Sequence, residues 1–113
     1  MPAVQCIVAY PARKPNGELA RFNLEYYLTK HMPMIDEYWG PCGLKAWDVF
    51  EFPLQSPLSG KDVEYSVLAT LEFDSLEGLK NALQSKETRA DVAMYCDVQP
   101  CIWVSEKVGS KCL

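Results

Sequence analysis

The sequence predicts an α+β fold of the ferredoxin-like type, in which a four-stranded antiparallel sheet carries two main helices on one face. The first observation is the order of strand and helix patterns, β-α-β-β-α-β, with one possible extra short helix before the last strand. The second is the length of 113 residues, which indicates a single domain over residues 1–113 with a C-terminal tail from about residue 107.

The first half of the chain contains a strand, an interrupted helix and a second strand. Apolar residues alternate over 3–10, as in a half-buried strand. Asn23 is a good helix cap. Pro33 cannot donate a backbone hydrogen bond, so we expect the helix to end or kink near His31 before its apolar pattern resumes. A Gly-Pro-Cys-Gly turn then leads into a strand at 44–52.

The second half begins with an exposed, proline-containing loop and a strand at 64–73. A helix is predicted to start at Asp74, because Asp74-x-x-Glu77 has the form of a capping box. A short helix is possible at 87–96, and the last strand is expected at 101–105.

The face of the sheet that the helices leave bare is predicted to be apolar. Alternation along the strands assigns Ile7, Trp47, Val49 and Leu68 to that face. Such a surface is unfavourable in water, and a second copy of the sheet would cover it. We therefore expect a homodimer, with an apolar cavity in the space left between the sheets.

Composition excludes several classes of partner. The net charge is −4 and the 11 basic residues are scattered, which argues against nucleic acid. No apolar run is long enough for a membrane span, and the N-terminus lacks a secretory signal, so we expect a cytoplasmic protein without a membrane partner. The five cysteines are then expected to be reduced, and no Cys and His cluster suggests a metal site.

The densest motif is the segment from Phe22 to Leu44, F-N-L-E-Y-Y-L-T-K-H-M-P-M-I-D-E-Y-W-G-P-C-G-L. It resembles the opening signature of the EthD family, within the dimeric α/β-barrel superfamily. The shared parts are the first Phe, the Tyr-Tyr pair, His-x-Pro and Trp-Gly-Pro-x-Gly-Leu. Two positions depart from the family pattern: Asn23 replaces a usual acidic residue, and Cys42 occupies a variable turn position.

The resemblance implies a ferredoxin-like chain that forms a dimeric α/β barrel. Members act on hydrophobic small molecules, often aromatic or polyketide-derived compounds of secondary metabolism. Chemistry in the superfamily includes cyclisation, decarboxylation, dehydration, cofactor-free oxygenation and, in some branches, haem chemistry.

His31, the single histidine, is the leading catalytic candidate, because its unperturbed pKa suits a general acid or base near neutral pH. The alternative is a structural imidazole that bonds a backbone carbonyl freed by Pro33. Asp36 or Glu37 could orient the ring, but their spacing from His31 favours a solvated helix face.

Two further side chains are candidates for the chemistry. Tyr27 lies four residues before His31, so it could hold the imidazole or stabilise an oxyanion, or simply pack in the core. Asp48 would be a base candidate if its strand register turns it into the cavity, and not if the register shifts by one.

Several apolar and aromatic side chains are expected to line the cavity, although Trp39 and Tyr26 also suit pure packing. The predicted substrate-binding residues are Tyr26, Trp39, Trp47 and Leu68.

These features predict a cofactor-independent lyase, cyclase or isomerase that acts on a hydrophobic carbonyl compound with His31 as general acid or base. The motifs for phosphate binding, metal binding or a catalytic triad are absent from the sequence, which favours simple proton transfer. Two alternatives stay open: a carrier that binds hydrophobic molecules without turnover, and a haem protein ligated through His31.

Overall fold

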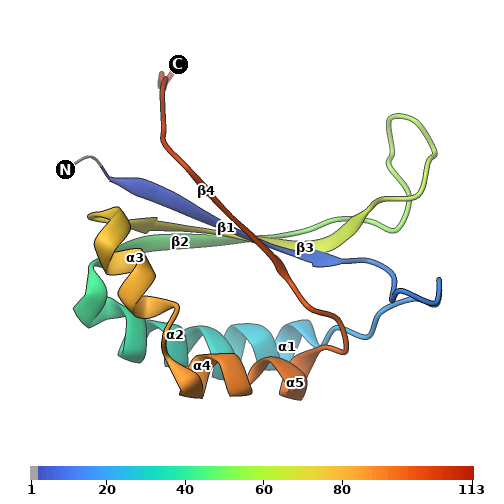
Figure 1. The fold of residues 1–113 in the computed structure, drawn as a ribbon. Coiled ribbons are helices and arrows are strands. Elements are labelled where there is room, and N and C mark those ends of the chain that lie inside the picture. The colour runs from blue at the N-terminus through green and yellow to red at the C-terminus, as the bar shows by residue number, and fades with distance from the viewer. Residues whose placement is uncertain (1–2) are drawn as a thin grey trace.

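A computed structural model describes residues 3–113. In this part of the chain the strands are β1 (Val4–Pro11), β2 (Leu44–Glu51), β3 (Tyr65–Phe73) and β4 (Cys101–Ser105). They form one four-stranded sheet in the order β2-β3-β1-β4, and each neighbouring pair is antiparallel. The helices pack together on one face of this sheet (Figure 1). The predicted ferredoxin-like α+β fold is therefore confirmed.

The first helical segment begins where the sequence predicts. Asn23 caps it, because its side-chain oxygen accepts a hydrogen bond from the Tyr26 backbone N–H at 3.0 Å. The segment then passes through four successive elements: α1 (Leu24–Tyr26), the π-helical turn η1 (Tyr27–His31), α2 (Met32–Trp39) and the 3₁₀ turn η2 (Gly40–Cys42).

The π-helical turn changes the expected effect of Pro33. The Met32 N–H bonds the Tyr27 carbonyl, so the turn before the proline is one residue wider than an α-helical turn. Pro33 then lies in the first turn of α2, where a missing N–H is tolerated. The chain stays helical through the proline, so the expected end of the helix near His31 is replaced by a change of helix type.

The second helical segment starts one residue later than predicted. Ser75, in extended conformation, is the cap, and its hydroxyl accepts a hydrogen bond from the Gly78 N–H at 3.1 Å. Asp74 instead pairs with Lys45 at 3.2 Å. The short helix expected at 87–96 is divided in two around Asp91. The elements of this segment are α3 (Leu76–Ala82), α4 (Lys86–Ala90) and α5 (Val92–Tyr95).

The core lies between the helices and the sheet face that they cover. Alternate residues of the two central strands are buried there, as the period of a strand requires. These residues are Val4, Cys6, Val8, Tyr10, Val67, Ala69, Leu71 and Phe73.

The predicted orientation of Trp47 and Val49 is wrong. The register of β2 against β3 shifts between Leu44 and Ala46, and the extra residue reverses the alternation of side chains in the rest of β2. Trp47 therefore lies opposite buried Leu71, on the helix side of the sheet. Its indole N–H donates to Asp36 of α2 at 2.8 Å, which fixes this orientation.

The open face of the sheet still carries apolar side chains. Leu68 lies there as predicted, and it pairs with Phe50 on one side and Ala9 on the other. Ile7 also lies there and pairs with Trp103 of β4. Phe50 is 50% exposed and Trp103 48% exposed, so they take the place that was expected for Trp47 and Val49.

Two segments extend from the body of the molecule on the side of the open face (Figure 1). One is the loop between β2 and β3, and the other is the C-terminal tail after Ser105, which has no regular secondary structure. All five cysteines are free thiols. None of the helices formed by residues 3–113 is long and apolar enough to cross a membrane.

Candidate functional site

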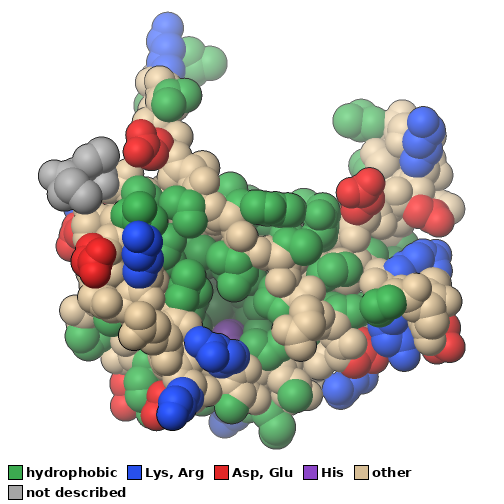
Figure 2. Space-filling view, in the orientation of Figure 1, with side chains coloured by type: hydrophobic (Ala, Val, Ile, Leu, Met, Phe, Trp, Pro, Cys, Tyr) green, Lys and Arg blue, Asp and Glu red, His purple; other side chains and the backbone are tan. Residues whose placement is uncertain are grey.

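A hollow opens between the helices and the sheet, and hydrophobic side chains surround it (Figure 2). The histidine of the chain is visible at its floor. The enclosed part has a volume of about 70 Å³. Its walls come from β1, β3, β4 and the helical segments, and consist of Val8, Tyr10, Tyr27, His31, Met32, Ile35, Trp39, Leu71, Val92, Tyr95, Pro100 and Ile102.

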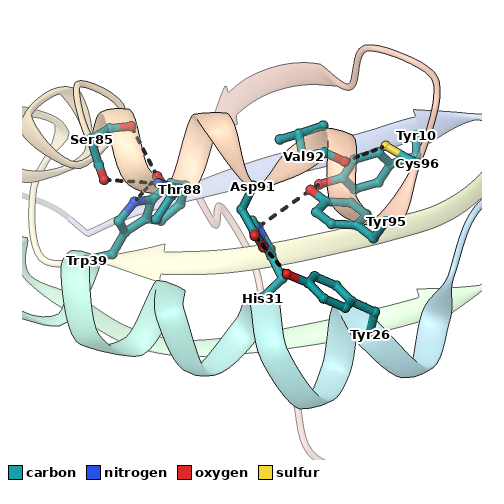
Figure 3. A network of polar contacts seen from close by, with 10 residues as sticks. All are labelled: Tyr10, Tyr26, His31, Trp39, Ser85, Thr88, Asp91, Val92, Tyr95 and Cys96. Carbon is teal, nitrogen blue, oxygen red and sulfur yellow. Dashed lines mark hydrogen bonds and ion pairs between the residues drawn. The ribbon is translucent and has the colours of Figure 1, made fainter.

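The central polar contact is an ion pair or hydrogen bond between His31 and Asp91. His31 Nδ1 lies 2.9 Å from Asp91 Oδ2. The two side chains are only 6% and 10% exposed, so water contributes little to the pair. His31 comes from the π-helical turn and Asp91 from the junction of α4 and α5, so the contact joins the two helical segments (Figure 3).

Asp91 is itself held by a second donor. The hydroxyl of Tyr26 donates to Asp91 Oδ1 at 2.8 Å, so each carboxylate oxygen has one partner (Figure 3). This arrangement restricts rotation of the carboxylate and thereby orients the imidazole ring. The Tyr27 ring, stacked on His31 with centroids 5.3 Å apart, supports the ring from one side.

The second imidazole nitrogen points toward tyrosine hydroxyls. His31 Nε2 lies 3.5 Å from the Tyr95 hydroxyl, and that hydroxyl lies 2.6 Å from the hydroxyl of Tyr10 (Figure 3). All three side chains line the cavity. The cavity therefore combines apolar walls with a short line of polar atoms.

Burial and Asp91 act in opposite directions on His31. Burial lowers its pKa and is the larger effect, while the hydrogen bond and the charge of Asp91 raise the pKa. The ring is therefore neutral at neutral pH. An anionic carboxylate can only accept a hydrogen bond, so Nδ1 carries the proton and Nε2 is an acceptor, with the Tyr95 hydroxyl 3.5 Å away.

The three tyrosines around the cavity remain protonated. Burial raises the pKa values of Tyr10, Tyr27 and Tyr95 far above that of free tyrosine. Their hydroxyls are thus protonated hydrogen-bond donors at neutral pH.

The structure brings together some of the residues predicted from the sequence. His31, Tyr27 and Trp39 line the cavity. Trp39 is also anchored, because its indole N–H donates to the Thr88 hydroxyl at 3.3 Å. Tyr26 holds Asp91 and does not line the enclosed part of the cavity.

The remaining predicted residues lie elsewhere. Asp48 is exposed on the open face of the sheet, because the register shift in β2 turns it toward solvent and pairs it with Thr70. Leu68 lies on that same open face, and Trp47 packs beside α2 outside the cavity. They contribute no wall to the cavity that contains His31.

The sequence did not reveal the partners of His31. Asp36 bonds Trp47, and Glu37 is exposed, so neither orients the imidazole. The ring contacts Asp91 and Tyr95 rather than a free backbone carbonyl. These partners lie at least sixty residues from His31 in sequence, beyond any helical spacing. The available signal was Asp91 itself, an acidic residue in the middle of the possible short helix.

The site does not fit haem or a metal cluster. The enclosed volume of about 70 Å³ is small beside the ~300–1,000 Å³ of ordinary ligand pockets. An iron on His31 Nε2 would also have to displace the Tyr95 hydroxyl. Within residues 3–113, His, Cys, Asp and Glu side chains do not gather in threes that could hold a metal.

Comparisons with known proteins agree on the fold. An EthD-like protein from Ralstonia eutropha JMP134 is 27% identical, with a TM-score of 0.81, and the match covers 98% of this chain and 96% of that one. An ethyl tert-butyl ether D (EthD) family protein from Bacillus halodurans C-125 is 18% identical, with a TM-score of 0.59, and the match covers 94% of this chain and 99% of that one. No family model and no curated protein matches the chain.

Proposed function

We propose that this chain, which the solved structures identify as a member of the EthD family, is a cofactor-independent acid–base enzyme for hydrophobic carbonyl compounds. One observation carries the proposal: His31 has Nδ1 on a buried carboxylate and Nε2 directed into an apolar cavity. A purely structural histidine has no need of an Nε2 acceptor that faces a cavity and has only a long 3.5 Å contact with Tyr95. A binding protein for apolar molecules has no need of a buried carboxylate behind it.

The chemistry begins with proton abstraction. His31 Nε2 removes a proton from the carbon next to the substrate carbonyl, and Asp91 stabilises the imidazolium that forms. Tyr26 keeps the carboxylate in place. Return of the proton to a different carbon or to a leaving oxygen gives isomerisation, cyclisation or elimination. A well-placed acid–base group contributes about 10²–10⁴-fold to the rate.

The apolar walls determine the kind of substrate. Only the reacting carbonyl and its neighbouring carbon need to enter the enclosed part of the cavity, and the rest of the molecule lies in the open hollow (Figure 2). Tyr27, Trp39 and Ile35 present aromatic and aliphatic surface, which favours an aromatic or polyketide-derived compound.

A homodimer is the second part of the proposal. Phe50, Leu68 and Ala9 form an apolar row across the open face, and Ile7 with Trp103 extends it. A second copy of the sheet would remove Phe50 and Trp103 from water. The cavity lies on the opposite side of the sheet, so in this proposal each protomer keeps its own site.

The function is tested with acetophenone, a small enolisable ketone, in D₂O. Proton NMR follows the loss of its methyl signal as His31 exchanges those protons for deuterium. We expect His31→Gln to lower the enzyme-dependent exchange rate by about 10²-fold or more. The circular dichroism spectrum and the oligomeric state should not change. Wild-type exchange that persists in a well-folded His31→Gln variant would overturn the catalytic role and favour a carrier.

A further inference from the structure

We propose that Tyr95 is a second catalytic residue, which donates a hydrogen bond to the substrate carbonyl oxygen while His31 removes the neighbouring proton, and that Tyr10 positions it. This inference rests on the proposed function and deepens it. It also narrows the substrate class to ketones or related carbonyl compounds with an acidic C–H beside the carbonyl.

The position of the Tyr95 hydroxyl carries the inference. It lies 3.5 Å from His31 Nε2, which is at the limit of a hydrogen bond, so the two atoms interact only weakly with each other. The rings themselves are in contact, with centroids 4.6 Å apart and a tilt of 55°. A base and a donor are thus held side by side at the floor of one cavity.

The direction of the hydrogen bonds makes Tyr95 a donor to the cavity. Asp91 holds the proton on Nδ1, so Nε2 can only accept, and Tyr95 must supply the proton between them. In the 2.6 Å contact between the two tyrosine hydroxyls, Tyr10 is then the donor and Tyr95 the acceptor. A substrate oxygen that enters can receive the Tyr95 proton without disturbing the bond from Tyr10.

Tyr10 holds the Tyr95 hydroxyl in position. It is 2% exposed, and it packs edge-to-face against Tyr95 with centroids 5.7 Å apart. Its hydrogen bond prevents the Tyr95 hydroxyl from rotating away, and a donor that accepts a bond is also a better donor. Burial keeps both hydroxyls protonated by raising their pKa values, so Tyr95 donates without losing its proton.

The step balances in atoms and charge. His31 Nε2 takes a proton from the α-carbon, and the electrons of that C–H bond form a carbon–carbon double bond as the carbonyl becomes an enolate. The enolate oxygen accepts the hydrogen bond from Tyr95, and Asp91 faces the new imidazolium. The site carries one net negative charge before and after the transfer. Donors aimed at such an oxyanion contribute strongly because they need no reorganisation.

The test compares three tyrosine-to-phenylalanine variants in the acetophenone exchange assay. We expect Tyr95→Phe to lower kcat by about 10²-fold or more and to change KM less than about threefold, because the bond strengthens only in the transition state. Tyr10→Phe, which removes only the positioning bond, should have a smaller effect, also on kcat. Tyr38→Phe removes a hydroxyl from an exposed position of α2 and should leave both constants unchanged.

A binding measurement tests the role of Tyr95 without relying on turnover. 4-Nitrophenol mimics the enolate, because its ionised oxygen can lie between Nε2 and Tyr95, and its absorbance reports ionisation. We expect Tyr95→Phe to weaken its binding by about tenfold or more and to suppress the bound phenolate signal. Unchanged kcat and unchanged phenol affinity in a folded Tyr95→Phe variant would overturn the inference. So would a wild type that neither binds the phenol nor exchanges the ketone.

The two proposals fail in different ways. If His31→Gln loses the exchange activity and Tyr95→Phe keeps it, the acid–base function stands but Tyr95 takes no part in it. If His31→Gln keeps full exchange activity, both the acid–base function and the catalytic role of Tyr95 are contradicted.

Discussion

Asp91→Asn separates the chemistry of the site from its stability. Asn is almost the same size as Asp and keeps one oxygen, so it can still accept from Tyr26. Its amide nitrogen is a donor, however, and when it faces His31 it selects the tautomer that carries the proton on Nε2. Nε2 then carries a proton, so it has no lone pair to accept a proton from a substrate in the cavity. The loss of charge also removes a contribution that raises the pKa of His31, so that pKa falls further.

The expected magnitudes follow from the contacts. Turnover should fall by about 10²–10⁴-fold, because a base in the wrong tautomer cannot accept a proton. The free energy of unfolding should fall by less than about 1.5 kcal/mol, since one neutral hydrogen bond replaces one charged bond. Asp91→Ala should cost about 1–3 kcal/mol, because it leaves the buried Nδ1 of His31 without an acceptor.

The assay for Asp91 pairs the acetophenone exchange rate with urea unfolding on the same preparations. We expect Asp91→Asn to lose far more activity than stability. An Asp91→Asn variant that exchanges the ketone at the wild-type rate would refute the assignment of Asp91 as the group that orients His31.

Three further predictions concern the fold and its assembly. Phe50→Asp places a charge in the proposed dimer interface, so light scattering should show monomers. Met94→Asp is the control, because Met94 is also apolar and 59% exposed but lies outside the interface, and this variant should stay dimeric. A Phe50→Asp variant that stays dimeric would contradict the proposed interface. Gly78→Ala should lower the free energy of unfolding by about 1–3 kcal/mol, because the new Cβ would clash with the backbone carbonyl oxygen of Cys42. Gly40→Ala is the control, because a Cβ at that position would meet nothing within 4 Å. Folding lowers the pKa of His31, so below its ordinary pKa of 6.5 the unfolded chain binds more protons than the folded chain. As the pH falls through this range, the wild type should therefore lose stability relative to His31→Gln. Parallel stability curves for the two proteins would count against a buried neutral His31.

The fold could be predicted because each element has a local signal. Alternation identified the strands, Asn23 marked a helix start, and the length limited the domain to one. The orientation of Trp47 could not be predicted, because it depends on one extra residue in the pairing of β2 with β3. A shift of one residue moves every later side chain to the other face. The same shift decides between the two registers left open for Asp48 and places it on the open face.

Only part of the site could be predicted from the sequence. His31 and Tyr27 share one helical segment, so their spacing revealed them. Asp91 and Tyr95 meet them only through tertiary packing of the second helical segment, and no spacing rule links positions sixty residues apart. The π-helical turn that presents His31 also has no simple signature, although Pro33 indicated that the helix is irregular at this point.

The proposed chemistry depends most directly on His31, which must direct an unprotonated Nε2 into the cavity. The chain has one histidine, so a two-bond ¹H–¹⁵N correlation spectrum of uniformly labelled protein contains a single imidazole and needs no assignment. At pH 7.5 we predict the neutral tautomer with the proton on Nδ1. A spectrum that shows the proton on Nε2 would contradict the account, because the cavity would then contain a donor where the mechanism needs a base.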